Sequence, residues 1–252
     1  MDKLSNSFSL LELDSEDANE HGPTATIAVD RCETRDSGKG VDKVLEDGTL
    51  LEKENADLQT RETTVGDYRM PLVWIDLEMT GLNIEVDRIL EIACVITDGN
   101  LNKLVEGPDL VIHQSKECLD KMGEWCQEHH GESGLTERVL QSTISEQEAE
   151  KEVIEFVKRH VDISTHTALI AGNSVYMDLL FIRKYMPDLA ALFSHVTVDV
   201  SSVKALCLRW YPRERKKAPQ KENKHRAMDD IKESIAELKF YKEHIFKQKS
   251  KK

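Results

Sequence analysis

The sequence has few of the features that place a chain in a membrane or in an oxidising compartment. Its five cysteines are scattered and odd in number, and no two of them form a CxxC pair. This pattern argues against a disulfide framework and a thiolate zinc site, and it favours a reducing compartment. No apolar run approaches the roughly 20 residues that a membrane-spanning helix needs. We therefore expect a protein with no membrane partner.

Recognisable targeting signals are missing as well. The N-terminal stretch LLELDSEDANE is acidic. A mitochondrial transit peptide is rich in Arg and poor in acids, and a secretory signal has a positive start and an apolar core. The sequence therefore predicts a cytoplasmic protein.

Excess basic charge is also lacking, because the net charge is −13. Such a value ordinarily argues against binding to nucleic acid. The charge is uneven, however. Residues 1–70 contain 17 acidic and 8 basic side chains, whereas residues 213–226 are locally basic. The net charge of the whole chain is therefore a poor guide to the site.

The composition divides the chain into three parts. Residues 1–70 are rich in Ser, Thr, Asp and Glu and lack sustained periodicity, which predicts a mostly disordered acidic extension. The spacing of Val and Leu also allows a short amphipathic helix over residues 41–58. Residues 71–247 alternate apolar and polar segments and form the predicted folded domain, and residues 248–252 are a basic, frayed tail.

The folded part begins with strands and continues with helices. Three strands joined by short turns, the second turn containing Asp98-Gly99-Asn100, predict an antiparallel meander. Helical and strand patterns then alternate, which predicts an α/β domain with a mixed five-stranded sheet flanked by helices. The expected strands cover residues 72–77, 88–98, 104–114, 168–173 and 195–200, and the expected helices cover residues 118–129, 146–160, 175–185, 202–210 and 226–246.

The stretch VWIDLEMTGL raises the first question of chemistry. Asp76 and Glu78 end an apolar strand, and residues i and i+2 of a strand point to the same face. Two adjacent carboxylates repel each other unless a cation or a shared proton lies between them. Carboxylate oxygens suit hard cations such as Mg2+ or Mn2+. The alternative is that the strand end has simply reached solvent.

Two later segments supply further candidates. Asp178 lies in the first turns of a predicted helix, where an acid also interacts favourably with the helix dipole. In HRAMDDIKES, Asp230 lies beside the apolar face of the last helix and Asp229 points away. His225 precedes Asp230 by about one turn, and a histidine beside clustered carboxylates is a candidate general base. Each signal has a structural alternative when taken alone.

Taken together, these segments resemble a known family. The motifs WIDLEMTGL, VEGPDL, GNSV, KYMP, DVSSVK, RWYP and HRAMDDIKES are similar to those of the DEDDh 3′→5′ exonucleases, and within them the oligoribonucleases. The resemblance covers residues 71–247 and implies the ribonuclease-H-like fold. It implies a homodimeric exonuclease that hydrolyses short single-stranded RNA to nucleoside 5′-monophosphates.

The resemblance also implies the roles of the acidic residues. The two metal ions, Mg2+ or Mn2+, would be held by Asp76, Glu78, Asp178 and Asp230. His225 would accept the proton of the attacking water. The pair of ions would stabilise the attacking and leaving oxygens of an in-line displacement.

Substrate contacts follow from the same resemblance. Leu82 and Trp125 match residues that hold bases, and stacking of an aromatic ring on a base tolerates any sequence. Without the resemblance, Trp125 could equally be a core aromatic residue. His130 matches a histidine that reaches over from the partner subunit, and Ser174 and Ser201 match hydroxyls near the 5′ phosphate.

One departure from the family pattern affects the expected substrate. Bacterial relatives have a Tyr-Arg pair where this chain has His195-Val196. The arginine that would cap the 5′ phosphate is therefore missing. His195 itself, or a basic residue of the loop at residues 213–224, could replace it, although that loop could also be a solvated connector.

Three functions stay open at this point. The first is an oligoribonuclease, and the second is a DEDDh exonuclease that trims longer RNA or DNA 3′ ends. The third is a catalytically silent protein that binds nucleic acid, against which the complete set of four acids and His225 argues. Mitochondria are the alternative location, because members of the family work there.

Overall fold

The computed structural model describes residues 68–163, 168–219 and 226–246. The chain divides between Arg61 and Glu62, and every described residue belongs to the second part. The predicted helix over residues 41–58 and the tail at residues 248–252 lie outside the described residues. So does most of the predicted N-terminal extension.

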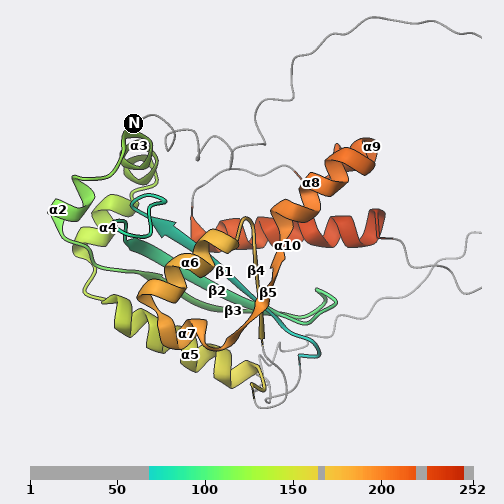
Figure 1. Ribbon diagram of the computed structural model, residues 1–252, viewed down its shortest axis with the longest axis horizontal. Helices are drawn as coiled ribbons and strands as arrows, with labels where there is room; N and C mark the ends of the chain where they lie inside the picture. Colours follow the sequence, from blue (N-terminus) through green and yellow to red (C-terminus); the bar gives the residue numbers. More distant parts are fainter. Residues whose placement is uncertain (1–67, 164–167, 220–225, 247–252) are drawn as a thin grey trace, which may run out of the picture. The chain divides into compact units, whose positions relative to one another are not determined.

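A five-stranded mixed sheet forms the centre of the described region (Figure 1). Its strand order is β3-β2-β1-β4-β5, with β1, β2 and β3 antiparallel and β4 and β5 parallel to β1. The predicted antiparallel meander and the mixed five-stranded sheet are thus confirmed. The strands are β1 (Leu72–Met79), β2 (Ile89–Thr97), β3 (Leu104–Val111), β4 (Ala168–Gly172) and β5 (Phe193–Asp199).

Helices connect the later strands and follow the last one. The element Glu146–His160 was predicted with the observed bounds, and its N-terminus is fixed by a capping box between Ser145 and Glu148. The helices are α2 (Lys116–Leu119), α3 (Glu124–Glu132), α4 (Leu135–Gln141), α5 (Glu146–His160), α6 (Tyr176–Tyr185), α7 (Pro187–Ala190), α8 (Val200–Trp210), α9 (Pro212–Arg215) and α10 (Ala227–His244). Among the described residues, none of these helices is long and apolar enough to cross a membrane.

One sequence-based expectation about the helices is wrong, and the helices α4, α7 and α9 were not predicted. The single helix expected over residues 118–129 is two helices, because the chain leaves α2 at Asp120 and restarts α3 after Gly123. The helix α4 was not predicted at all. It begins after Gly134, which has the left-handed φ of 71°, and its few buried residues give only a weak periodic signal.

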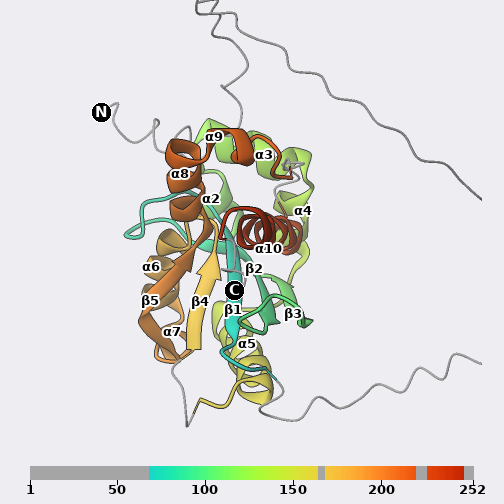
Figure 2. The same ribbon diagram turned by 90° about the vertical axis from the view of Figure 1, so that its right-hand side faces the viewer.

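The sheet carries a separate apolar layer on each face. Figures 1 and 2 show α10 on one side of the sheet and α5 with α7 on the other. Val73, Ile75 and Leu77 of β1 pack in the core cluster that includes α5 and α6. Leu72 and Trp74 pack in the second cluster with α10. Alternate residues of β1 therefore face α10, and this alternation determines where the next side chains in the row point.

Candidate active site

The row of β1 side chains that faces α10 changes from apolar to acidic toward the end of the strand. Leu72 and Trp74 are buried under α10. Asp76 and Glu78 continue the same row and are half-buried. The strand therefore carries two carboxylates to the rim of the apolar layer on the α10 side.

The third carboxylate of this cluster comes from α10. Ala227 and Ile231 are buried against the sheet, and Asp230 lies next to Ile231 in the first turn of the helix. One ligand atom from each of Asp76, Glu78 and Asp230 lies within 4.8 Å of the others. Asp229 is not part of the group, as the helical pattern of the sequence indicates.

The cluster concentrates negative charge. The pKa of the Glu78 carboxyl is well above its usual range, first because the group is buried and then because Asp230 lies close to it. Glu91 and Asp178 raise this pKa further, and the guanidinium of Arg226 opposes them. A divalent cation among the three carboxylates would offset this repulsion. The donor set is all oxygen, which fits a hard cation.

Asp178 reaches the site from α6, past the end of β4. The pairing of β1 with β4 covers only Leu72–Trp74, and the backbone N–H of Leu77 donates a hydrogen bond of 3.0 Å to Asp178 Oδ1. Burial raises the pKa of the Asp178 carboxyl to about 7, although the hydrogen bond from Leu77 lowers it. Asp178 contributes to the electrostatics of Glu78, but it is not one of the three residues within 4.8 Å.

Glu91 is a buried acid that the sequence reasoning missed. It lies opposite Glu78 in the β1–β2 ladder, and its side chain is fully buried. Its carboxylate accepts hydrogen bonds from Arg226 at 2.9 Å, from Arg138 at 3.3 Å and from the backbone N–H of Ala227 at 3.2 Å. A single acid inside the apolar stretch ILEIACVIT was the available signal, because a buried charge needs partners. These partners make Glu91 a link to α10 and not a metal ligand.

Two residues with expected substrate contacts lie in α3. Trp125 is half-buried, and its ring stacks on His129 with centroids 3.9 Å apart. His130 is buried within its own chain, where Nε2 is 2.9 Å from the carbonyl oxygen of Met79. Its Nδ1 is 3.9 Å from the Glu78 carboxylate. His130 therefore lies beside an acid of its own chain.

The two serines come together where the chain leaves β4 and β5, because Ser174 follows β4 and Ser201 lies at the start of α8. The hydroxyls of Ser174 and Ser201 are 2.9 Å apart. Ser174 has the left-handed φ of 53°, and its N–H donates to Asp199 Oδ1 at 2.8 Å. Asp199 also caps α8, where it accepts from the N–H of Ser201 and Ser202. This capping explains why α8 begins at Val200, two residues before the predicted start.

The other candidate residues lie in loops and on β5. Leu82 is half-buried in the loop that follows β1. His195 and Val196 are exposed on β5, the last strand of the sheet. His225 lies outside the described residues, directly before Arg226. The structure thus brings Asp76, Glu78 and Asp230 together, places Asp178 and His130 beside them, and pairs the two serines.

Comparison with protein families identifies the class to which this arrangement belongs. Residues 73–238 match a family model described as Exonuclease. The matched segment includes all of β1 but its first residue, α6 and the first two thirds of α10, and therefore the three clustered carboxylates and Asp178. The protein is a nuclease of the exonuclease class.

Similar proteins give a narrower family. An oligoribonuclease of Arabidopsis thaliana is 59% identical over 98% of this chain and 99% of its own length. The human protein named "Oligoribonuclease, mitochondrial" is 53% identical over 71% of this chain and 74% of its own. An oligoribonuclease of Haemophilus influenzae is 51% identical over 70% of this chain and 95% of its own. The chain belongs to the oligoribonuclease family, which confirms the resemblance seen in the sequence.

Solved structures support the fold. A structure of exonuclease I matches with a TM-score of 0.56 and 17% identity, over 70% of this chain and 42% of that chain. A structure of Escherichia coli exonuclease I in complex with a dA16 oligonucleotide matches with the same TM-score, identity and coverage. At this identity the likeness concerns the fold alone. It confirms the predicted ribonuclease-H-like α/β architecture.

The buried carboxyl of Asp178 leads to a prediction about stability in the absence of metal. Its pKa of about 7 lies above the ordinary 3.8, so between these values the folded state binds more protons than the unfolded state. The contribution of this group to the free energy of unfolding is therefore full below pH 4 and is lost as the pH rises through 7. We expect Asp178→Asn to be more stable than the unsubstituted protein at pH 8, in thermal unfolding with EDTA followed by circular dichroism.

The variant keeps an oxygen that can accept from Leu77, so it changes the charge and little else. The matched control is Asp188→Asn on the neighbouring α7, where the side chain is exposed. Unfolding curves for Asp178→Asn and the unsubstituted protein that run parallel from pH 4 to 8 would contradict the assignment. Added Mn2+ should stabilise the unsubstituted protein more than Asp178→Asn.

Proposed function

We propose that the protein is a 3′→5′ exoribonuclease that degrades short oligoribonucleotides to nucleoside 5′-monophosphates by metal-dependent hydrolysis. The observation that carries the proposal is the cluster of Asp76, Glu78 and Asp230 within 4.8 Å, in a chain of the oligoribonuclease family. Exposed acids often gather without function, but these are half-buried. The raised pKa of Glu78 also marks a group that needs a compensating charge.

The carboxylates would hold two divalent ions, Mg2+ or Mn2+, with Asp178 as the fourth ligand. Bound ions lower the pKa of water and stabilise charge on the attacking and leaving oxygens of an in-line displacement. The N–H of Leu77 holds Asp178 Oδ1 in place. The second carboxylate oxygen of Asp178 accepts no hydrogen bond from Leu77, and we assign this second oxygen to the metal.

His225 would accept the proton of the attacking water. It precedes α10 in the sequence, and Asp230 of the same helix belongs to the cluster. Arg226, the next residue, donates to buried Glu91 at 2.9 Å. This ion pair fixes the chain directly after His225, and an imidazole is suited to proton transfer near neutral pH.

The remaining candidates would bind the oligonucleotide. Leu82 and Trp125 would hold bases, since ring stacking gives affinity without sequence preference. Ser174 and Ser201 would contact the 5′ phosphate. Their hydroxyls are 2.9 Å apart, and Ser201 Oγ donates to Asn173 Oδ1 at 2.7 Å, so the hydroxyls would turn from these contacts to donate to a phosphate. His130 would also contact the substrate, and its Nδ1 lies 3.9 Å from the Glu78 carboxylate.

One observation favours a second candidate class of substrate. His195 and Val196 are exposed on β5, where bacterial relatives carry Tyr-Arg. Without the arginine, the enzyme would have less reason to prefer substrates whose 5′ phosphate lies close to the scissile bond. The alternative is a DEDDh exonuclease that acts on longer RNA or DNA 3′ ends.

The proposal is tested with 5′-labelled RNAs from the dinucleotide upward. We expect dinucleotides to be cleaved fastest with Mn2+ or Mg2+ and EDTA to stop the reaction. Asp230→Asn should lower kcat/KM by at least about a hundredfold, because it removes a charged ligand at the reacting centre. The matched control is Asp229→Asn, a neutralised acid one residue away that lies outside the cluster, and it should retain most of the activity.

The outcomes separate the alternatives. Equal rates on dinucleotides, long RNA and DNA would be consistent with the proposed metal site. They would replace the proposed preference for short RNA by the alternative, a DEDDh exonuclease that acts on longer RNA or DNA 3′ ends. In that case Val196→Arg should restore a preference for short RNA. The absence of metal-dependent cleavage at every length would remove the enzymatic proposal.

We also propose that the protein is a homodimer. Among the described residues, Leu206 and Trp210 are exposed one turn apart on α8, and Tyr211 follows them, with 44%, 66% and 43% of their surfaces exposed. Adjacent exposed apolar side chains mark contact surfaces. Light scattering should give twice the chain mass, and Trp210→Lys should halve it. A single-chain mass for the unsubstituted protein would exclude the dimer.

The proposed location is the cytosol, with mitochondria as the alternative. The four described cysteines are free, which suits a reducing compartment. The human relative is named as mitochondrial, whereas the name of the Arabidopsis thaliana relative gives no compartment. Cell fractionation with antibodies against the protein decides between them. Recovery in the mitochondrial matrix alone would exclude the cytosolic location.

A further inference from the structure

The loop that carries Leu82 is internally closed. At its base, the N–H of Thr80 donates to the carbonyl of Arg88 at 3.0 Å, and the N–H of Arg88 donates to Thr80 Oγ1 at 3.0 Å. Thr80 Oγ1 donates to Asp87 Oδ1 at 2.8 Å, and Asp87 Oδ2 accepts from the N–H of Asn83 at 2.8 Å. We call residues 81–87 the Leu82 loop. Its shape is set before any substrate arrives.

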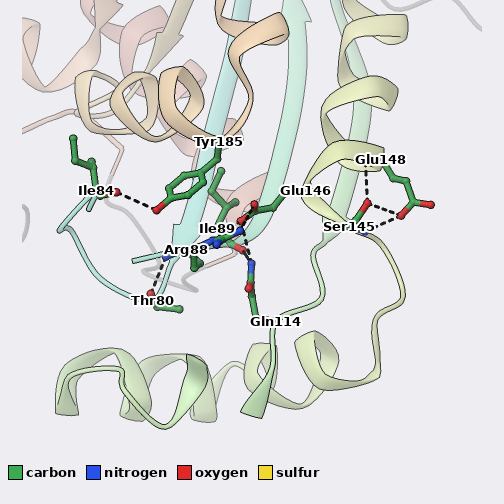
Figure 3. Close-up of polar contacts among 9 residues, drawn as sticks. All are labelled: Thr80, Ile84, Arg88, Ile89, Gln114, Ser145, Glu146, Glu148 and Tyr185. Carbon is green, nitrogen blue, oxygen red and sulfur yellow. Dashed lines mark hydrogen bonds and ion pairs between the residues drawn. The ribbon is translucent and has the colours of Figure 1, made fainter. Parts of the chain in front are cut away.

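Arg88 attaches the base of this loop to α5. Figure 3 shows its guanidinium directed at the carboxylate of Glu146, the first residue of α5. Nε donates to Glu146 Oε1 at 3.0 Å, and a second nitrogen donates to the other carboxylate oxygen. Gln114 also donates to Glu146 Oε1, at 3.1 Å, and to the carbonyl of Ile89, at 3.0 Å. A two-pronged pair of this kind restricts orientation as well as distance.

Tyr185 attaches the middle of the loop to α6. Its hydroxyl donates to the carbonyl of Ile84 at 3.0 Å, as Figure 3 shows. The Arg88 guanidinium lies over the same ring, 4.7 Å from its centroid. Tyr185 ends the helix that begins two residues before Asp178. One rigid helix therefore contacts both the metal-site region and the Leu82 loop.

We propose that Arg88 and Tyr185 are positioning residues for substrate recognition, which hold the Leu82 loop in the conformation that presents Leu82 to a base of the oligonucleotide. The inference rests on the proposed function and extends it to residues that do not touch substrate. A loop that must be ordered during binding loses conformational freedom at that moment, and a preorganised loop avoids this loss. We call the contacts of Arg88 with Glu146 and of Tyr185 with Ile84 the clamp. Loosening the clamp should therefore weaken substrate binding and leave the chemical step intact.

The main test is Tyr185→Phe, which removes the hydroxyl and keeps the ring under Arg88. We expect KM for a dinucleotide to rise about two- to tenfold, the range for one lost hydrogen bond, with kcat unchanged. Arg88→Lys keeps the charge but loses the two-pronged contact with Glu146, and it should raise KM as well. Amide hydrogen exchange of Asn83, Val86 and Asp87 should be faster in both variants. An unchanged KM for both variants, with an active unsubstituted enzyme, would overturn the proposal.

A double-substitution cycle asks whether the clamp acts through Leu82. In a Leu82→Ala background, Tyr185→Phe should raise KM no further, because the side chain that it positions is gone. If the effects of Leu82→Ala and Tyr185→Phe on KM are fully additive in free energy, the clamp does not act through Leu82 and the proposal is overturned. If the unsubstituted enzyme cleaves no dinucleotide at all, the proposed function fails, and this outcome is distinct from a failure of the clamp.

Two controls separate positioning from general loss of stability. Tyr241→Phe removes another hydroxyl, which donates to buried Glu237 at 2.6 Å, and it should lower the melting temperature without changing KM. Lys184→Met removes the ion pair with Glu85 of the Leu82 loop. Because Glu85 is exposed, this ion pair contributes little to holding the Leu82 loop. KM for Lys184→Met should therefore stay within about twofold of the unsubstituted value. A rise in KM for Tyr241→Phe equal to that for Tyr185→Phe would mean that the effect is one of stability, and it would overturn the clamp.

Discussion

The buried carboxylate of Glu91 joins the sheet to the last helix, and the geometry of the site depends on that junction. Glu91 accepts from the side chain of Arg226 and from the N–H of Ala227, so it fixes the start of α10 against β2. Removing one partner of a buried ion pair costs about 3–5 kcal/mol because the other charge stays buried. Asp230 lies one turn into α10 and thereby faces Asp76 and Glu78. The three carboxylates of the cluster meet because Glu91, which lies outside the cluster, holds the start of α10 through its hydrogen bonds with Arg226 and Ala227.

Two buried carboxyl groups of the site, Glu78 in the cluster and Asp178 beside it, work against folding. Glu78 and Asp178 have raised pKa values, mainly because burial disfavours their charged forms. The apolar layers on both faces of β1 supply the stability that tolerates them. A divalent ion would offset the negative charge of these groups, so the charge that disfavours folding would favour the binding of a cation. Stability in the absence of metal and affinity for metal are thus opposite consequences of one arrangement.

The helix α6 relates the chemistry to the substrate. Its first turn brings Asp178 to the N–H of Leu77, and its last residue, Tyr185, reaches the carbonyl of Ile84 in the Leu82 loop. A displacement of this helix would move a proposed metal ligand and a proposed base contact together. The helix α6 thereby connects the proposed base contact to the proposed metal site.

Local periodicity in the sequence determined which acids share a face. The two-residue repeat of β1 places Asp76 beside Glu78, and the helical repeat of α10 selects Asp230 over Asp229. The start of α5 follows equally from its capping box. Only the tertiary structure decided that Asp178 accepts from Leu77, that His130 lies beside Glu78 in its own chain, and that Arg88 meets Glu146. These partners are more than 50 residues apart in the chain, and packing alone brings them together, whereas periodicity records only the environment of near neighbours.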